Sequence, residues 1–221
     1  MGICYILGAM PVLELPVQPK AGDFVIAADG GLENCRRLGL RPDLICGDFD
    51  SLGSVPAEEN VVRAPVEKDD TDMALAVTLG TRRGYTRFVL LGGAGGRPDH
   101  TLANYALLAH LSQTGRRAVL FGDGWAAAAI TDSALDFPTG CKGTVSVFAW
   151  DTMVRGVEEQ GLQYTLQDAR LYSAVALGVS NAFLGQPARI GVKQGTLLVL
   201  LEQEAAILAL DALLEVSNEE S

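Results

Sequence analysis

The sequence predicts an α/β fold in two parts: a doubly wound, mainly parallel sheet, followed by an antiparallel β-sandwich. Two observations favour this fold class. Short apolar runs alternate with helical patterns as far as residue 124, and strand patterns separated by turn residues dominate after it. We therefore predict an α/β domain over residues 1–124 and a β-sandwich domain over residues 125–221.

Six short apolar runs in the first part are expected to be strands of the fully buried kind. They cover residues 3–7, 24–28, 44–46, 61–62, 88–91 and 118–121. Apolar residues at helical spacing predict helices between these runs, over residues 31–40, 73–84 and 102–115. Strands that alternate with helices indicate parallel βαβ units.

The second part has four clear strand candidates, over residues 125–131, 144–149, 188–192 and 197–201. Turn residues separate them, such as Pro138-Thr139-Gly140. A helix is expected over residues 205–214. So short a sandwich has a modest core, and we expect it to pack on the first domain or on a second subunit.

Composition excludes several classes of protein. The formal net charge of −10 argues against nucleic-acid binding, which requires a basic face. The chain lacks a run of about 18 apolar residues, so we expect no membrane span. The first ten residues lack the basic region of a secretory signal, and a cytoplasmic protein is expected. The four cysteines have no C-x-x-C spacing, and we expect them to be buried thiols.

Three clusters of chemically active residues each follow a short apolar run. Two are acidic: residues 48–50 read Asp-Phe-Asp, and residues 69–72 read Asp-Asp-Thr-Asp. The third, residues 92–100, is a glycine-rich loop that ends in Arg-Pro-Asp-His. Mg²⁺ prefers oxygen ligands, and it binds one or two carboxylates together with substrate phosphates. The clusters therefore predict a magnesium–nucleotide site and phosphoryl or pyrophosphoryl transfer.

The placement of these clusters supports the same prediction. Together with Asp29-Gly30-Gly31, each of them follows an expected strand. Ligands of open α/β sheets bind outside the carboxyl ends of the strands, so four such segments would gather at one edge. Simpler explanations exist for single residues: Asp29-Gly30 is a common turn, and Asp69, Asp70 or Thr71 would suit a helix N-cap. Capping does not explain several carboxylates in one cluster, because like charges repel unless a cation lies between them.

The glycine-rich loop does not match known phosphate fingerprints. Pro98 stands where G-x-G-x-x-G needs its last glycine, and no G-x-x-x-x-G-K-[ST] motif occurs. A phosphate site here would use Arg97 as its cation and the N-terminus of the following helix as a further donor.

At these residues the chain resembles the thiamine pyrophosphokinase family. The matching segments are residues 42–51 (P-D-L-I-C-G-D-F-D-S), 68–72 (K-D-D-T-D) and 92–104 (G-G-A-G-G-R-P-D-H-T-L-A-N). Their order and spacing make the resemblance specific. In the second part, residues 161–166 (G-L-Q-Y-T-L) and 178–181 (G-V-S-N) resemble elements near the vitamin. Ala182 departs from the pattern, since many members place Glu there.

The resemblance implies an enzyme that binds Mg²⁺, ATP and thiamine and acts as a homodimer with active sites between subunits. The implied metal ligands are Asp48, Asp50, Asp69 and Asp72. The implied nucleotide contacts are Asp29, Gly30, Lys68, Thr71, Gly93, Gly95, Gly96, Arg97 and His100. The implied substrate contacts are Asp99, Tyr164, Ser180 and Asn181.

For the reaction, the resemblance implies that the hydroxyl of thiamine attacks the β-phosphorus of ATP and AMP leaves. Arg97 would stabilise the charge that shifts between phosphate oxygens. Either Asp72 or Asp99 would accept the hydroxyl proton, and the sequence does not choose between them. Two alternatives stay open at this point: a pyrophosphokinase of a pterin alcohol, and a nucleotide or thiamine sensor without turnover.

Overall fold

The computed structural model describes residues 2–47, 61–63 and 71–215. The chain divides into two compact units. Unit 1 comprises Met1–Asn104 and Leu120–Gly122, and unit 2 comprises Tyr105–Val119 and Asp123–Ser221. Helix α3 (Pro98–Gln113) and strand β6 (Arg117–Phe121) contribute residues to both units. The predicted domain boundary after residue 124 stays a prediction.

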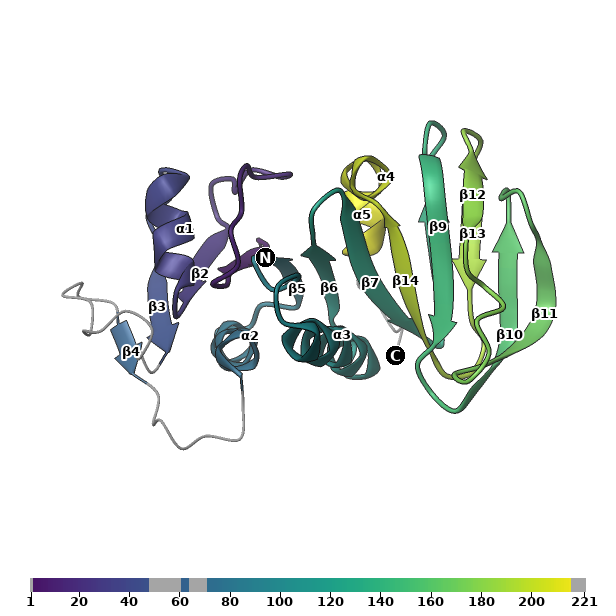
Figure 1. The fold of residues 1–221 in the computed structure, drawn as a ribbon, viewed down its shortest axis with the longest axis horizontal. Helices are drawn as coiled ribbons and strands as arrows, with labels where there is room; N and C mark the ends of the chain where they lie inside the picture. The colour runs from purple at the N-terminus through teal and green to yellow at the C-terminus, as the bar shows by residue number, and fades with distance from the viewer. Residues whose placement is uncertain (1, 48–60, 64–70, 216–221) are drawn as a thin grey trace. The chain divides into compact units, whose positions relative to one another are not determined.

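Unit 1 is built on a sheet with the strand order β5-β1-β2-β3-β4 (Figure 1). The strands are β1 (Cys4–Leu7), β2 (Phe24–Ala28), β3 (Leu44–Gly47), β4 (Val61–Arg63) and β5 (Arg87–Leu91). All four pairings between them are parallel. From β1 the sheet extends to β2 on one side and to β5 on the other, so the strand order reverses there. The predicted doubly wound parallel sheet is confirmed.

Two helices of unit 1 cover this sheet. The helix α1 (Gly31–Arg37) follows β2, and α2 (Asp72–Arg82) precedes β5. Their crossovers run in opposite directions along the sheet, so right-handed connections place them on opposite faces (Figure 1). Helix α2 begins where the Oγ1 of Thr71, with extended backbone, accepts a hydrogen bond from the N–H of Ala74 at 3.2 Å. Thr71 is therefore the N-cap, as the capping alternative expected.

Unit 2 holds two antiparallel sheets, with the strand orders β12-β9-β14-β7 and β11-β10-β13-β8. The strands are β7 (Trp125–Thr131), β8 (Ala134–Phe137), β9 (Lys142–Ala149), β10 (Met153–Gln160), β11 (Leu166–Tyr172), β12 (Asn181–Leu184), β13 (Ala188–Gly191) and β14 (Thr196–Glu202). Phe137 of one sheet packs on Phe183 of the other, with ring centroids 4.9 Å apart. The expected C-terminal helix is two short helices, α4 (Gln203–Leu208) and α5 (Leu210–Leu213).

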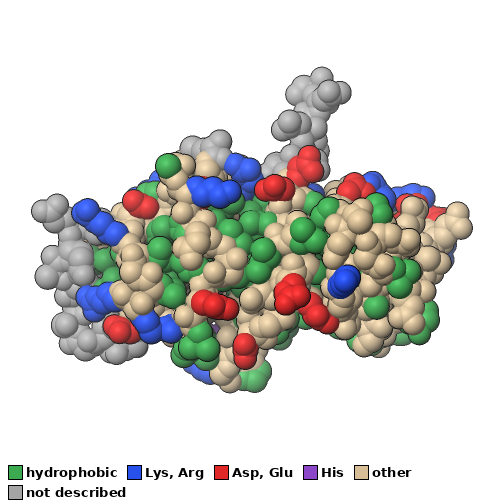
Figure 2. Space-filling view, turned by 90° about the horizontal axis from the view of Figure 1, so that it is seen from above, with side chains coloured by type: hydrophobic (Ala, Val, Ile, Leu, Met, Phe, Trp, Pro, Cys, Tyr) green, Lys and Arg blue, Asp and Glu red, His purple; other side chains and the backbone are tan. Residues whose placement is uncertain are grey.

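The surface and the cysteines fit the expectations from composition. On the face that Figure 2 shows, acidic, basic and apolar side chains are interspersed. All four cysteines are buried free thiols. Burial raises the pKa of Cys4 and of Cys35 to about 12, which keeps both thiols protonated. Within the described part of the chain, no helix has the length and apolarity that crossing a membrane requires.

Candidate active site

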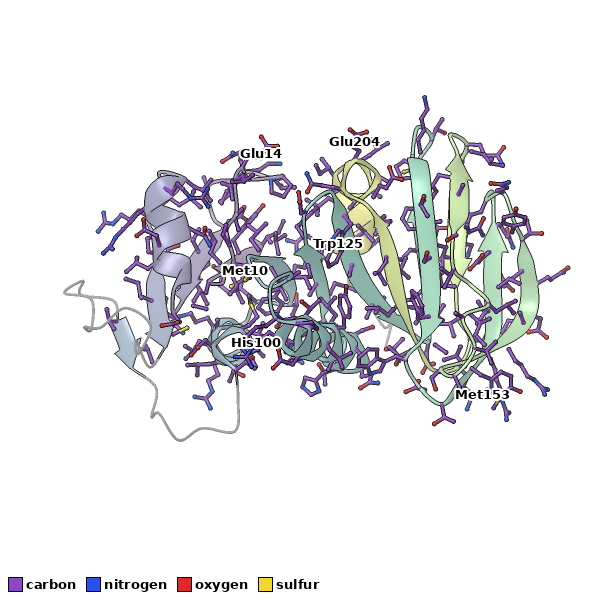
Figure 3. All side chains as sticks on the ribbon, in the orientation of Figure 1. Met10, Glu14, His100, Trp125, Met153 and Glu204 are labelled. Carbon is purple, nitrogen blue, oxygen red and sulfur yellow. The ribbon has the colours of Figure 1, made fainter. Side chains whose placement is uncertain are left out.

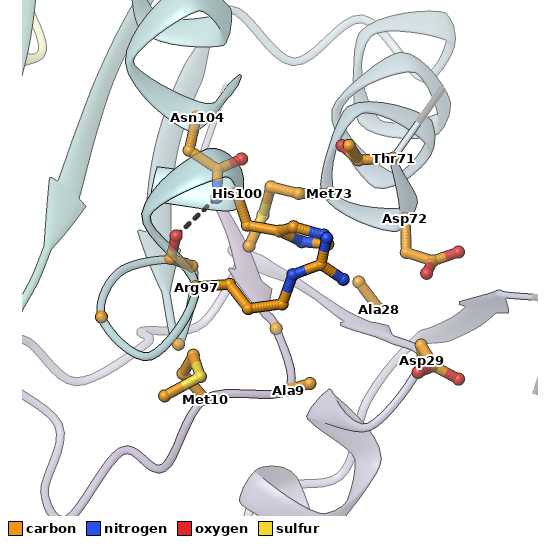
Figure 4. Close-up of a pocket in the computed structure, with 14 residues that line it drawn as sticks. Ala9, Met10, Ala28, Asp29, Thr71, Asp72, Met73, Arg97, His100 and Asn104 are labelled. Atoms are coloured by element: carbon orange, nitrogen blue, oxygen red, sulfur yellow. Dashed lines mark hydrogen bonds between the residues drawn. The ribbon is translucent and has the colours of Figure 1, made fainter. Parts of the chain in front are cut away.

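A cavity of about 450 Å³ lies in unit 1 at the carboxyl ends of the parallel strands (Figure 4). Its wall comes from the segment after β1, the end of β2, the start of α2, and the loop and helix turn after β5. The cavity therefore lies at the reversal of strand order, where open α/β sheets bind their ligands. Its size suits a small-molecule ligand.

The polar side chains of the cavity come from segments far apart in the sequence. Arg97 and His100 lie at the start of α3 on one side, and Asp29 and Asp72 lie on the other (Figure 4). Met10, in the segment after β1, adds an apolar thioether (Figure 3). The guanidinium of Arg97 thus lies across the cavity from the side chains of Asp29 and Asp72 (Figure 4).

The structure brings most of the predicted nucleotide residues together. The predicted residues that line the cavity are Asp29, Thr71, Asp72, Gly93, Gly95, Arg97 and His100. Gly30, Gly96 and Asp99 are sequence neighbours of lining residues but do not line it themselves. Five further lining residues were not predicted: Gly8, Ala9, Met10, Ala28 and Met73. Gly92 and Asn104 also line the cavity, and both belong to the motif of residues 92–104.

The guanidinium of Arg97 is held by the carboxylate of Asp99. Its Nε donates to Oδ1 at 3.2 Å, and its Nη2 donates to Oδ2 at 2.5 Å. This hydrogen bonding lowers the pKa of the Asp99 carboxyl and raises the pKa of Arg97, although both groups are exposed. Asp99 is therefore an anion here, and its two hydrogen bonds fix the orientation of the Arg97 guanidinium beside the cavity.

The glycine-rich loop is fastened to α3 at two points. The Nδ2 of Asn104 donates to the carbonyl of Gly93 at 2.5 Å, and the N–H of Gly95 donates to Oγ1 of Thr101 at 3.1 Å. Gly95 has a φ of 90°, a left-handed conformation that favours glycine. A Cβ on Gly93 would lie 2.9 Å from Nδ2 of Asn104, so a side chain at that position would displace the Asn104 amide that fastens the loop.

The segment after β1 is fixed by a residue that the sequence did not reveal. Asn34 of α1 is buried, and its Nδ2 donates to the carbonyls of Gly8 at 2.7 Å and Met10 at 2.8 Å. Its Oδ1 accepts from the N–H of Val12 at 3.1 Å and from Arg37 at 2.7 Å. The only sequence signal was a polar residue between Leu32 and Cys35 in an apolar stripe. We call these contacts the Asn34 clamp.

Asp29 has a φ of 47°, which is uncommon for a residue with a side chain. Its N–H donates to the carbonyl of Cys46 at 2.7 Å, and Gly47 lies so close that a Cβ there would be 3.1 Å from Cα of Asp29. The chain thus leaves β3 beside Asp29, directly before Asp48. Strained backbone of this kind is typical of ligand sites.

Four predicted residues of the metal and nucleotide site lie outside the described residues: Asp48, Asp50, Lys68 and Asp69. Among the residues that the structure describes, no group of three His, Cys, Asp or Glu side chains could hold a metal ion. Asp29 and Asp72 nevertheless offer carboxylate oxygens at one side of the cavity (Figure 4). These hard oxygen donors fit Mg²⁺, while no thiolate that would favour a softer metal lines the cavity within the described part.

The predicted vitamin residues lie together in unit 2. Oδ1 of Asn181 accepts from the N–H of Tyr164 at 2.9 Å, and its Nδ2 donates to the carbonyl of Tyr164 at 2.7 Å. Asn181 is buried, whereas Tyr164 is 63% exposed and Ser180, with a φ of 62°, is also exposed. A direct substrate contact therefore suits Tyr164 and Ser180, and the direct contact predicted for Asn181 stays a prediction.

A buried acid next to these residues was not predicted from the sequence. Glu159 of β10 is 2% exposed, and its Oε2 accepts from Nδ2 of Asn181 at 2.6 Å. Burial raises the pKa of Glu159 above its ordinary value of 4.5, and the hydrogen bond from Asn181 opposes that rise. The folded protein thus holds this proton more tightly than the unfolded chain does.

We expect the free energy of unfolding of Glu159→Gln, minus that of the wild type, to increase as the pH rises from about 4 to about 8. With a raised folded pKa, the contribution of Glu159 to stability is complete below the unfolded pKa and is lost as the pH rises through the folded pKa. Each pH unit between the two pKa values changes the difference by about 1.4 kcal/mol. Urea unfolding at several pH values measures it, and a difference that falls with pH would contradict the prediction.

Comparisons with known proteins agree with this geometry. Residues 19–120 match the family model described as "Thiamin pyrophosphokinase, catalytic domain". The chain is 26% identical over 188 residues to "Thiamin pyrophosphokinase 1" of Caenorhabditis elegans. The aligned region is 78% of this chain and 74% of that protein.

Solved structures show the same fold. The thiamine pyrophosphokinase from Bacillus subtilis superposes with a TM-score of 0.80 at 22% identity, over 90% of this chain and 98% of that chain. The yeast thiamin pyrophosphokinase superposes with a TM-score of 0.70 at 15% identity, over 93% and 88%. At these identities the structural likeness concerns the fold.

Proposed function

We propose that the chain is a thiamine pyrophosphokinase, which transfers the pyrophosphoryl group of ATP to the hydroxyl of thiamine and gives thiamine diphosphate and AMP. The family model that matches residues 19–120 and the Caenorhabditis elegans relative support this proposal. The observation that supports this most is the cavity at the strand-order reversal, which Asp72, Arg97 and His100 line. The reported relatives are all thiamine pyrophosphokinases, so the pterin-alcohol and sensor alternatives have no support.

We propose Mg²⁺ as the metal of this site. Asp72 would hold it, together with Asp48, Asp50 and Asp69 of the acidic motifs. When bound, Mg²⁺ would neutralise phosphate charge and orient the polyphosphate. An acidic site of this kind needs the cation, because the carboxylates alone would repel a nucleotide.

The described side chains have distinct tasks in the transfer. The guanidinium of Arg97 would hold phosphate oxygens as charge moves from the attacked phosphorus to the leaving AMP. His100 and the N–H groups of the glycine-rich loop would bind further oxygens. Asp72 or Asp99 would accept the proton of the thiamine hydroxyl. Asp72 lines the cavity and Asp99 is bound to Arg97, so we favour Asp72.

The decisive experiment is an assay of the purified protein with ATP, Mg²⁺ and thiamine. The proposal expects AMP and thiamine diphosphate in equal amounts, with no product when Mg²⁺ is removed by chelation. Formation of ADP would instead indicate transfer of a single phosphoryl group and would contradict the proposal.

For the vitamin side, Tyr164→Ala is expected to weaken thiamine binding by about 1–2 kcal/mol, through lost aromatic and cation–π contact with the thiazolium. The KM for ATP should change little, because Tyr164 belongs to unit 2 and the nucleotide cavity to unit 1. Steady-state kinetics with each substrate varied in turn measures both effects. Tyr164→Phe keeps the ring and should keep the thiamine KM. Equal losses for ATP and thiamine would mean that Tyr164 supports the fold.

We also propose that the enzyme is a homodimer. Unit 2 exposes apolar side chains on and beside β11 and β12, more than a third of each being accessible; they are Tyr172, Val175, Leu177, Val179 and Leu184. A second copy would cover them. The sedimentation coefficient and the specific activity should fall together as the protein is diluted. Full activity in a proven monomer would reject the proposal that the active site is shared between subunits.

A cytoplasmic location is proposed as well, since buried free thiols suit a reducing compartment.

A further inference from the structure

Glu159 forms a polar bridge between the two sheets of unit 2. It lies in β10 of one sheet, and its partner Asn181 begins β12 of the other. The Oε2···Nδ2 distance is 2.6 Å, and both side chains are almost completely buried. The second carboxylate oxygen, Oε1, has no hydrogen-bond partner among the described residues. A buried acid with a free oxygen is unfavourable for folding, so its presence requires an explanation.

The side-chain amide of Asn181 uses all of its hydrogen-bonding positions. Its Oδ1 accepts from the N–H groups of Tyr164 and Ala182, each at 2.9 Å. Its Nδ2 donates to the carbonyl of Tyr164 and to Glu159. Two donors and two acceptor positions are all used, which is the full capacity of an amide. A flipped amide would place its oxygen against the Glu159 carboxylate and the Tyr164 carbonyl, so the acid adds to the backbone's preference for one orientation.

This amide holds the segment that carries the exposed tyrosine. The N–H of Gln163 donates to the carbonyl of Ala182 at 2.9 Å, and Leu162 forms an isolated bridge with Phe183. Leu162 and Gln163 therefore pair with β12 through an isolated bridge. The Asn181 amide bonds both backbone groups of Tyr164 at the end of this pairing, and the Tyr164 ring points into solvent with 63% of the residue accessible.

We propose that Glu159 is a positioning residue for the vitamin side of the site: its carboxylate fixes the Asn181 amide, and that amide fixes the backbone of Tyr164. The inference rests on the proposed function, because thiamine is the substrate that the Tyr164 ring would contact. It adds a residue that touches no substrate. An apolar side chain at position 159 would leave one buried N–H of Asn181 without an acceptor, and the amide would lose one of the four hydrogen bonds that hold it.

The test compares Glu159→Leu, which removes the acceptor, with Glu159→Gln, which keeps an oxygen for the Asn181 N–H. Val157→Ala is the matched control, because Val157 is buried in the same strand and makes no side-chain hydrogen bond. Should Glu159→Leu fail to fold, Glu159→Met replaces it with a more adaptable apolar chain. Two readouts are used: amide hydrogen exchange at Tyr164, and the KM values for thiamine and ATP.

We expect Glu159→Leu to speed exchange of the Tyr164 N–H and to raise the thiamine KM about tenfold, with the ATP KM unchanged. Glu159→Gln should restore both values, and Val157→Ala should change neither. Unchanged exchange at Tyr164, or an unchanged thiamine KM in an active enzyme, would overturn the inference. A wild-type protein that does not turn over thiamine would reject the proposed function instead, and exchange at Tyr164 would still test the link from Glu159.

Discussion

Asp72→Asn is expected to lower kcat at least about 100-fold while leaving the fold intact. The amide keeps the volume of the carboxylate but can neither accept the hydroxyl proton nor hold Mg²⁺ by charge. Asp72 is the first residue of α2, so the lost charge also weakens the helix N-terminus, by about 0.3–1 kcal/mol. AMP formation at saturating ATP, Mg²⁺ and thiamine measures kcat.

Glu204→Gln is the matched control for this experiment. Glu204 also lies in the first turn of a helix, α4, is exposed, and is not among the residues that line the cavity. It should therefore reproduce the small effect on stability without any effect on kcat. Wild-type turnover in Asp72→Asn would remove Asp72 from both the metal site and proton transfer.

Arg97→Lys is expected to lower kcat about tenfold or more, with a much smaller change in the thiamine KM. The guanidinium donates to Asp99 through Nε and Nη2 and would bind phosphate through its other N–H groups, and an ammonium group cannot hold both partners in this fixed arrangement. The phosphate oxygens gain charge during transfer, so the loss should fall on kcat. Steady-state kinetics with thiamine varied at saturating ATP separates the two parameters.

Arg189→Lys offers a matched control, because Arg189 forms a comparable exposed pair with Asp136 in unit 2. It should leave kcat unchanged. If Arg97→Lys raised only the thiamine KM, Arg97 would belong to the vitamin site and not to the phosphate site.

Much of the nucleotide side could be predicted because its signals are local. Strands β1 and β3 are short, wholly buried apolar runs, and such runs are visible in one sequence. The glycine-rich loop and Arg97 form one continuous motif. Parallel strands then bring Asp29, Asp72 and Arg97 to one edge, which follows from the fold class alone.

The contacts that were missed depend on partners distant in the sequence. Asn34 resembles any polar helix residue until the carbonyls of the segment after β1 are placed against it. Glu159 was missed because no strand was predicted over residues 153–160. The register of β10 with β11 also shifts between Arg155 and Val157 and between Val157 and Glu159. A β-bulge changes which face a residue occupies, so alternation counted from the buried Val154 would not place Glu159 inside.

The Asn34 clamp has a consequence for the thermodynamics of nucleotide binding. It immobilises the backbone from Gly8 to Val12 through contacts within the chain, so the conformational entropy of this wall is lost during folding. An arriving nucleotide does not have to order that wall, and more of its contact energy remains as affinity. The entropy cost of ordering this wall therefore belongs to folding and does not reduce the free energy of nucleotide binding.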